Sequence, residues 1–266
     1  MIIGQDELVN YFLNTSFESL PRTSMLIGPK GSGKHSLLQL ISENCGIQAM
    51  DVSDKINLDL IEFISVRPEP FIYYIEADKI SEKDENTLLK LLEEPLSNTC
   101  IFILCNHESS LLPTVQNRCY KFKLKPYSQS ILKQFIPAGI SDEILQYANT
   151  PGQLINMSAQ DLEAQKLLAN NMFFKIKNAT VPNTLSISEK FSFKNEKNKF
   201  DFNIFLSILH RIIYDIICNS NVSRQYYLAY KLTNQLYHDQ FIPHIDQRLL
   251  FENYLLQLKK LFRDEN

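Results

Sequence analysis

Glycine is scarce in this sequence of 266 residues, which contains seven glycines. Average usage of about 7% would give about 19 in a chain of this length. Three of the seven, Gly28, Gly31 and Gly33, nevertheless fall within six positions. The scarcity elsewhere makes this cluster stand out, and it singles out one loop of the chain.

Cysteine is also sparse, and its arrangement argues against two kinds of site. The five cysteines are odd in number and include no CxxC pair. Neither a disulfide framework nor a zinc site is therefore indicated, and we predict reduced thiols and no bound zinc. The cysteines are Cys45, Cys100, Cys105, Cys119 and Cys218.

The sequence also lacks an excess of basic charge and a long apolar run. A net charge of -3 and a pI near 6.0 argue against a globally basic surface that coats nucleic acid, although a local basic strip stays open. The opening residues, MIIGQDELVNYF, lack the basic flank and apolar run of a signal peptide. No segment approaches the roughly 20 apolar residues of a membrane span. We expect a cytoplasmic protein without a membrane partner.

The first 124 residues alternate short apolar runs with helical patterns, which is typical of an α/β domain around a mostly parallel sheet. The clearest helix follows Ser81, an N-cap residue, has an acidic first turn and stops before Pro95. Strands are predicted at 25–27, 71–75, 100–105 and 120–124, and helices at 6–13, 34–43 and 82–93.

The rest of the chain is predicted to be helical. After Pro126, short helices at 128–135 and 142–148 end at a Thr-Pro-Gly turn at 150–152, which suggests a small lid. Residues 175–199 are rich in lysine and are interpreted as a mobile loop. Two amphipathic helices follow, whose apolar faces indicate core more readily than a subunit interface. These faces contain Phe202, Phe205, Leu206, Leu209, Ile212, Ile213 and Ile216, then Leu250, Tyr254, Leu255, Leu258 and Phe262.

The glycine cluster lies in GPKGSGK at 28–34, between a predicted strand and a predicted helix. In that context GxxxxGK wraps backbone N–H groups around phosphate oxygens, and its lysine meets the terminal phosphates as a cation. The pattern predicts a site for ATP or ADP; a tight strand-to-helix turn without a ligand is the alternative. The predicted nucleotide-binding residues here are Gly28, Gly31, Ser32, Gly33 and Lys34.

The positions that hold magnesium in such sites are altered. His35 stands where Ser or Thr would supply a hydroxyl group. Ser36 cannot replace it, because one step along a helix turns a side chain by about 100°. Ile75 stands where an aspartate is expected, and Glu76 is left as a vestigial catalytic base. We predict no magnesium site and no hydrolysis by this chain, while a retained nucleotide and an empty loop both stay open.

Several further stretches belong together with this loop. They are Ile3-Gly4-Gln5, IEADK at 75–79, LLKLLEEP at 88–95, LLPTVQNRC at 111–119 and PHIDQRLLFENYLL at 243–256. The combination resembles the clamp-loader subunits of the AAA+ class. The resemblance implies an α/β plus all-α chain: an AAA+ P-loop domain with a parallel sheet at 1–124, a helical lid at 125–159, and a helical collar at 160–266 that joins subunits in a ring.

The resemblance also assigns roles to single residues. In the family a Ser-Arg-Cys motif places its arginine in the neighbouring subunit's ATP site, and the matching residue here is Arg118, as a finger acting in trans. A surface ion pair is the alternative role for Arg118. Asn106 matches the polar sensor beside the terminal phosphate, or caps a turn. The family's zinc module and the arginine expected near Gln153 are both absent, which again favours a subunit that does not turn over ATP.

Together these features predict a non-hydrolysing accessory subunit of the DNA polymerase III clamp-loader complex, which helps load the sliding clamp onto primed DNA. The implied partners are clamp-loader subunits of the gamma/tau and delta types, the sliding clamp, and primer-template DNA through the assembled hetero-oligomer. Two alternatives stay open. One is an active motor that recruits magnesium through Ser36 or Asp78. The other is a different AAA+ replication or recombination factor, although no helix-turn-helix with a basic recognition helix is seen.

Overall fold

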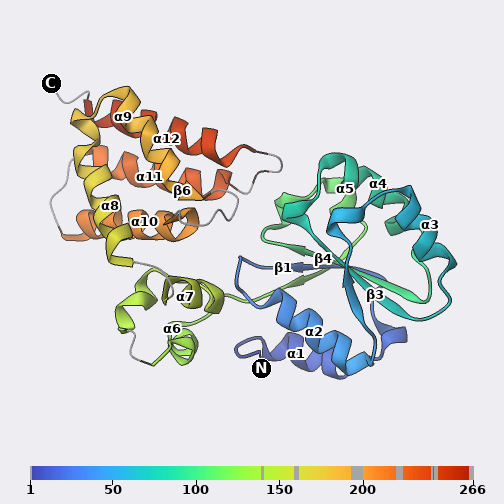
Figure 1. Ribbon diagram of the computed structural model, residues 1–266. Coiled ribbons are helices and arrows are strands. Elements are labelled where there is room, and N and C mark those ends of the chain that lie inside the picture. Colours follow the sequence, from blue (N-terminus) through green and yellow to red (C-terminus); the bar gives the residue numbers. More distant parts are fainter. Residues whose placement is uncertain are drawn as a thin grey trace. The chain divides into compact units, whose positions relative to one another are not determined.

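The chain divides into two compact units, which are described separately (Figure 1). The computed structural model describes residues 2–138, 141–158, 162–192, 200–219, 224–240, 242 and 245–263. The α/β unit comprises Met1–Ile131 with Thr150–Gly152, and the helical unit comprises Leu132–Asn149 with Gln153–Asn266. The three-domain division expected from the resemblance stays a prediction.

The α/β unit is built on a parallel sheet of five strands in the order β2-β3-β4-β1-β5, which confirms the predicted fold class. The four predicted strands are present, and the short edge strand β2 is an addition that the sequence pattern did not indicate. The strands are β1 (Thr23–Ile27), β2 (Ala49–Asp51), β3 (Phe71–Glu76), β4 (Thr99–Cys105) and β5 (Tyr120–Lys123).

The central strands are buried along their whole length, as expected for a parallel sheet covered on both faces. Because side chains alternate between faces, Met25 and Ile103 join one core while Leu26 and Phe102 join the other. Helices α1 and α2 cover one face, and α3, α4 and α5 cover the other (Figure 1). These helices are α1 (Asp6–Leu13), α2 (Lys34–Cys45), α3 (Leu58–Val66), α4 (Glu82–Glu93) and α5 (Pro113–Gln116).

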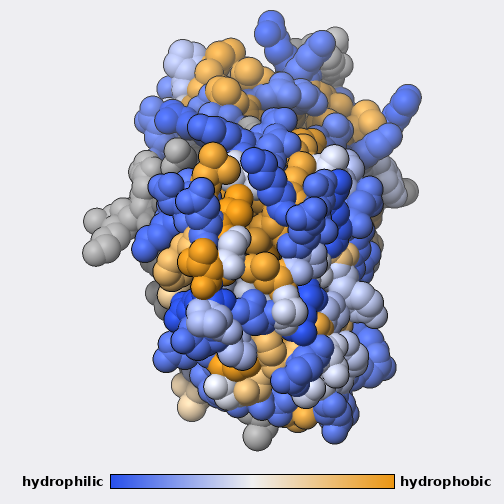
Figure 2. Space-filling view, turned by 90° about the vertical axis from the view of Figure 1, so that its right-hand side faces the viewer, coloured by the Kyte–Doolittle hydropathy of each residue, from blue (hydrophilic) through white to orange (hydrophobic). Residues whose placement is uncertain are grey.

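Helix α4 matches its predicted bounds because its signals are local. Ser81 accepts a hydrogen bond from the Asp84 N–H, and the Asp84 carboxylate accepts one from the Ser81 N–H, which forms a capping box. Helix α3 was not predicted. In its sequence, LDLIEFISV, apolar residues also flank the exposed polar positions, which hides the inward-facing stripe, and Phe63 and Val66 remain exposed. Figure 2 views the side on which α3 lies, where apolar residues interrupt a largely polar surface.

The helical unit contains the longest helices. Helix α10 packs against α8 and α11, and α11 packs against α12. Most of the predicted apolar face residues are buried, including Phe205, Leu209, Leu255 and Leu258, so the interpretation as core is confirmed for them. The helices of this unit are α7 (Pro151–Ser158), which begins in the α/β unit, α8 (Leu162–Lys175), α9 (Val181–Leu185), α10 (Phe202–Asn219), α11 (Arg224–Asp239) and α12 (Gln247–Arg263), with a ribbon of β6 (Phe191–Ser192) and β7 (Phe200–Asp201). The short helix α6 (Gln129–Leu132) lies at the boundary of the two units.

Two predictions in this region are wrong in part. Residues 142–148 do not form an α-helix; a 3-10 helix spans Asp142–Gln146. The loop predicted at 175–199 is structured through residue 192, because Thr180 caps α9 and Phe191 is buried against Phe205, with ring centroids 4.4 Å apart. The high lysine content of this segment led to the prediction of a loop, and the two structural contacts of Thr180 and Phe191 could not be recognised from composition. Residues 193–199, like residues 243 and 244 of the expected collar motif, lie outside the described residues.

Among the described residues, α10 alone has the length and composition of a membrane-spanning helix, with a mean hydropathy of 1.2 over its 18 residues. The expectation that no segment approaches this limit was therefore too strong. A core helix of a bundle has the same composition, and seven residues of α10 are buried in the helical unit.

Candidate functional site

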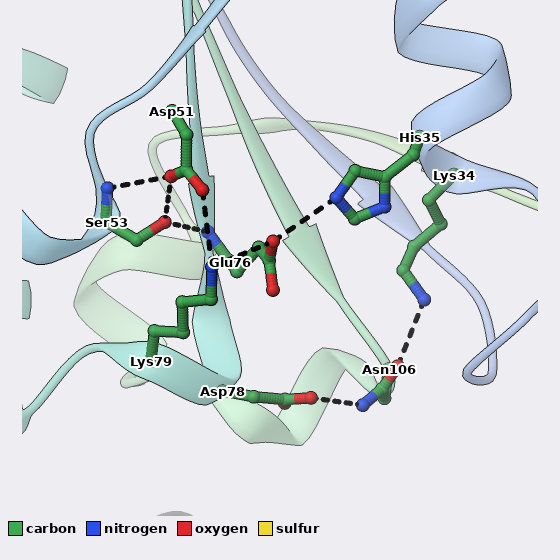
Figure 3. Close-up of polar contacts among 8 residues, drawn as sticks. All are labelled: Lys34, His35, Asp51, Ser53, Glu76, Asp78, Lys79 and Asn106. Atoms are coloured by element: carbon green, nitrogen blue, oxygen red, sulfur yellow. Dashed lines mark hydrogen bonds and ion pairs between the residues drawn. The ribbon is translucent and has the colours of Figure 1, made fainter. Parts of the chain in front are cut away.

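The predicted site residues other than Arg118 gather at the carboxyl ends of the parallel strands, where open α/β sheets bind ligands. The glycine loop follows β1, Glu76 ends β3, and Asn106 follows β4. Figure 3 shows two groups there, with Lys34 pointing toward Asn106 and His35 pointing toward Glu76.

Backbone geometry gives the loop at 28–34 its wrapped form. Gly33, at the start of α2, has φ 96°, and Gly31 has φ 81°, a left-handed conformation that glycine adopts at little cost. Gly28 is needed for space: a Cβ there would lie 2.8 Å from the Ser32 Oγ and 3.1 Å from the Leu124 Cβ. The fold therefore explains why the scarce glycines lie in this segment.

Lys34 is the buried cation of the site, with 8% of its surface exposed. Its Nζ donates to the Asn106 Oδ1 at 3.0 Å, to the Pro29 carbonyl oxygen at 3.2 Å and to the Gly28 carbonyl oxygen. Burial lowers the pKa of Lys34 to about 8, although the negative charge of Asp78 acts in the opposite direction. Lys34 and Asn106, predicted from separate motifs, are thus brought together.

Three successive carbonyl groups of the loop each accept a hydrogen bond from a later segment of the chain. The donors are the Thr150 Oγ1 to Lys30 at 2.9 Å, the Gly152 N–H to Gly31 at 3.0 Å, and the Tyr127 hydroxyl to Ser32 at 2.7 Å. These carbonyls are therefore satisfied by Tyr127, Thr150 and Gly152, and the loop is held in its wrapped conformation. Sequence patterns gave no signal for these donors.

The loop residues fit a phosphate group. Among the described residues, the Ser32 Oγ is one of the few buried polar side-chain atoms without a hydrogen-bond partner. A buried hydroxyl without a partner is costly, and a phosphate oxygen would supply the acceptor. Together with Lys34, it gives the loop a donor and a cation for a nucleotide phosphate.

The residues at the metal positions do not fit Mg²⁺. The His35 Nε2 lies 3.3 Å from the Glu76 Oε1, so a nitrogen side chain stands where an oxygen ligand is needed. Glu76 is also paired with Lys79 at 3.2 Å, and Asp78 accepts from the Asn106 Nδ2 at 2.6 Å. Ile75 is buried in the core. Near the loop, Glu76 is therefore already paired with Lys79, and Asp78 is hydrogen-bonded to the neutral amide of Asn106.

A polar network on β2 and β3 lies beside this pair, and sequence reasoning missed it. Lys79 bridges Glu76 and Asp51, and the Ser53 Oγ accepts from the Glu76 N–H at 2.9 Å (Figure 3). Partial burial raises the pKa of Asp51, but hydrogen bonds from Ser53 and Lys79 outweigh it, so the pKa is lowered overall. This network holds Glu76 among cationic and hydroxyl groups.

Arg118 lies at the opposite edge of the sheet from the loop. It follows α5 and precedes β5, and its carbonyl oxygen accepts from the Thr23 Oγ1 at 2.7 Å, at the start of β1. The loop begins after Ile27, at the other end of the same strand. Five strand residues at about 3.3 Å each separate the two edges by about 16 Å. Arg118 and the chain's own loop are therefore not brought together.

Comparisons with known proteins give matches to subunits of replication complexes. The family described as "DNA polymerase III, delta subunit" matches residues 59–128. Replication factor C subunit 5 of Homo sapiens is 25% identical over 205 residues, covering 68% of this chain and 59% of that protein. Replication factor C small subunit of Archaeoglobus fulgidus is 29% identical over 152 residues, covering 50% of this chain and 47% of that protein. The matches thus span about half to three fifths of these relatives' lengths.

Solved structures with a similar arrangement include two from Thermotoga maritima. A DNA polymerase III gamma subunit-related protein has a TM-score of 0.46 and 14% identity, covering 98% of this chain and 100% of that chain. The Holliday junction branch migration motor RuvB has a TM-score of 0.48 and 16% identity, covering 96% and 88%. The sequence matches to the delta subunit family and the replication factor C subunits support the AAA+ clamp-loader family for this chain.

Proposed function

We propose that this chain is a delta-prime-type subunit of a DNA polymerase III clamp loader, that it does not hydrolyse ATP, and that Arg118 completes the ATP site of a neighbouring subunit. One observation carries the proposal: Arg118 and the phosphate loop lie at opposite edges of one sheet. An arginine placed there reaches phosphate only on another molecule. Its planar guanidinium offers paired donors to phosphate oxygens.

The chain's own site supports the non-catalytic half of the proposal. Phosphoryl transfer depends on a metal that neutralises the developing charge. His35 and Lys79 already pair with Glu76, the residue left to act as a base. The loop, with Lys34 and Asn106, retains groups for holding ATP or ADP, so its task in this account is to bind nucleotide or to stabilise the fold.

The partners follow from the same proposal. They are clamp-loader subunits of the gamma/tau and delta types, with the sliding clamp and primer-template DNA reached through the assembly, in the cytoplasm. The described helices of the 160–266 region bury apolar faces within the helical unit, so contacts with partners use what those faces leave exposed, such as Tyr227 and Leu249.

The DNA-stimulated ATPase of the reconstituted complex tests the proposal. In a complex whose only intact ATPase site is the one next to this chain, Arg118→Ala should lower turnover at least tenfold, because an arginine finger contributes about 10³ to 10⁵ in rate at its own site. Lys123→Ala is the matched control, since it removes a cation from neighbouring β5 and should leave the rate within twofold. Equal rates for Arg118→Ala and wild type would contradict the proposal.

A motor subunit is the second candidate. The chain of hydrogen bonds from Lys34 through Asn106 to Asp78 favours it, because it places a carboxylate close to the phosphate lysine. A motor predicts magnesium-dependent ATP hydrolysis by the purified chain and its loss in Lys34→Ala. Absence of turnover in complexes whose partner sites are disabled would exclude this candidate.

A further inference from the structure

Helix α4 holds the segment that carries Arg118 at two points. Near its beginning, the buried Glu85 accepts a hydrogen bond from the Leu112 N–H at 2.7 Å, at the start of α5. At its end, the Glu93 Oε1 accepts from the Arg118 Nη2 at 2.5 Å. Two carboxylates eight residues apart on one helix therefore fix both ends of the α5 segment.

The contacts of Arg118 leave part of its guanidinium available. Besides Glu93, the Nη1 donates to the Thr114 carbonyl oxygen at 2.8 Å. A guanidinium has five N–H donors in a fixed plane, and these two bonds use two of them. About a third of the side chain is exposed, at 34%. The arginine is thus oriented by two bonds while its remaining donors stay accessible to an acceptor from outside.

We infer that Glu93 is a positioning residue for Arg118, which fixes the guanidinium plane before it meets the neighbouring subunit's phosphates. This inference rests on the proposed function of Arg118. A long, flexible side chain loses rotamer freedom when it is fixed, and a partner that fixes it beforehand removes that loss from the reaction step. Small misplacements of a catalytic group lower rates strongly, so the effect appears in turnover.

A purely structural role for the Glu93–Arg118 pair predicts that removal of Glu93 lowers the melting temperature of the chain. The positioning role predicts that it does not. Half of the Glu93 side chain is exposed, and ion pairs at such positions contribute little to stability. Removing Glu93 should therefore leave the melting temperature of the chain almost unchanged. A competing role, in which Glu93 holds the arginine away from phosphate, predicts faster hydrolysis when Glu93 is removed.

The experiment measures DNA-stimulated ATPase in the reconstituted complex with Glu93→Ala, Glu93→Gln and the control Glu94→Ala, which removes the adjacent exposed carboxylate. Glu93→Ala should lower kcat about tenfold with KM for ATP within about twofold, since orientation affects the transition state rather than binding. Glu93→Gln keeps an acceptor oxygen and should restore most of the rate. Glu94→Ala should match wild type.

A double mutant separates this inference from the proposed function. In an Arg118→Ala background, Glu93→Ala should add no further loss, because the two residues act as one unit. If Arg118→Ala lowers kcat while Glu93→Ala leaves it unchanged or raises it, the positioning role is overturned and the proposed function stands. If Arg118→Ala itself has no effect on kcat, both the positioning role and the proposed function are contradicted. A fall in melting temperature parallel to the loss of kcat for Glu93→Ala would also overturn the positioning role.

Discussion

At the scale of single residues, Lys34 has a charge that is costly where it lies. Burial brings its pKa to about 8, and its ammonium is held by carbonyl oxygens and Asn106 rather than by an ionised partner in direct contact. In a phosphate loop this arrangement favours an anion, because a phosphate would compensate the buried charge. The surroundings of Lys34 therefore favour binding of a phosphate at this position.

The depressed pKa of Lys34 predicts a pH dependence of stability. Between about pH 8 and the ordinary lysine pKa of about 10.4, the unfolded chain holds a proton at Lys34 that the folded chain has lost, so stability rises with pH in that window. Relative to Lys34→Met, the wild-type free energy of unfolding should gain up to about 3 kcal/mol between pH 7.5 and 10.5. Urea unfolding of wild type and Lys34→Met across this pH range measures the difference in free energy of unfolding, with Lys123→Met, at an exposed lysine, as control. Parallel curves of free energy of unfolding against pH for wild type and Lys34→Met would contradict the prediction.

The backbone of Gly152 lies close to the backbone of Gly31 in the phosphate loop. A Cβ on Gly152 would lie 2.4 Å from the Gly31 Cα, so Gly152→Ala forces backbone apart and weakens the Gly152 N–H bond to Gly31. We expect a loss of about 1 to 3 kcal/mol in the free energy of unfolding. Gly46→Asn is the control, because Gly46 has φ 66° and open space around it. Equal stability of Gly152→Ala and wild type in urea unfolding would show that the contact is not maintained.

At the scale of elements, helix α4 has three structural roles. Its N-terminus carries its own capping box, its apolar side covers the sheet, and it contacts α5. Its capping box predicts that Ser81→Ala lowers the free energy of unfolding by about 1 kcal/mol. Ser65→Ala in α3 is the control, because the Ser65 hydroxyl bonds only back to the Ile61 carbonyl within the helix and its loss should be near neutral. A denaturant midpoint for Ser81→Ala equal to that of the control would contradict the cap's contribution.

The elements also show what the sequence could predict. Helix α4 and strand β4 have local signals, a cap and a continuous apolar run, and both match their expected positions. Strand β2 is three residues long, and helix α3 has apolar residues beside its polar positions, so neither offers a clear periodic pattern. The segment at 176–192 is stabilised by tertiary contacts such as that of Phe191, which composition conceals.

For the site, the predictable part was the chemistry that one motif contains. The spacing of the glycines and of Lys34 predicted the phosphate loop, and the resemblance to a known family predicted that Asn106 belongs to the same site. The donors Tyr127 and Thr150 were not predictable, because each is more than 90 residues from the carbonyl it contacts. The contact between Glu93 and Arg118 was hidden for the same reason, since it links two motifs 25 residues apart.

At the scale of the whole molecule, the proposed role of Arg118 depends on the polarity of one sheet. Parallel strands place their carboxyl ends, with the phosphate loop, at one edge and their amino ends, with Arg118, at the other. The α/β unit therefore has a phosphate-loop edge and an arginine edge on opposite sides of its sheet. In the assembly that we propose, head-to-tail contact would join the arginine edge of this chain to a neighbour's phosphate loop, a heterologous interface that closes into a ring when the rotation allows.

The most direct test of this account is single-turnover ATP hydrolysis in a reconstituted complex in which only the ATPase site next to this chain is intact. With Arg118→Ala, hydrolysis at that site should slow by about 10³-fold or more, as for loss of an arginine finger, while ATP binding there persists. A rate equal to that of the wild-type complex would contradict the claim that Arg118 acts on its neighbour.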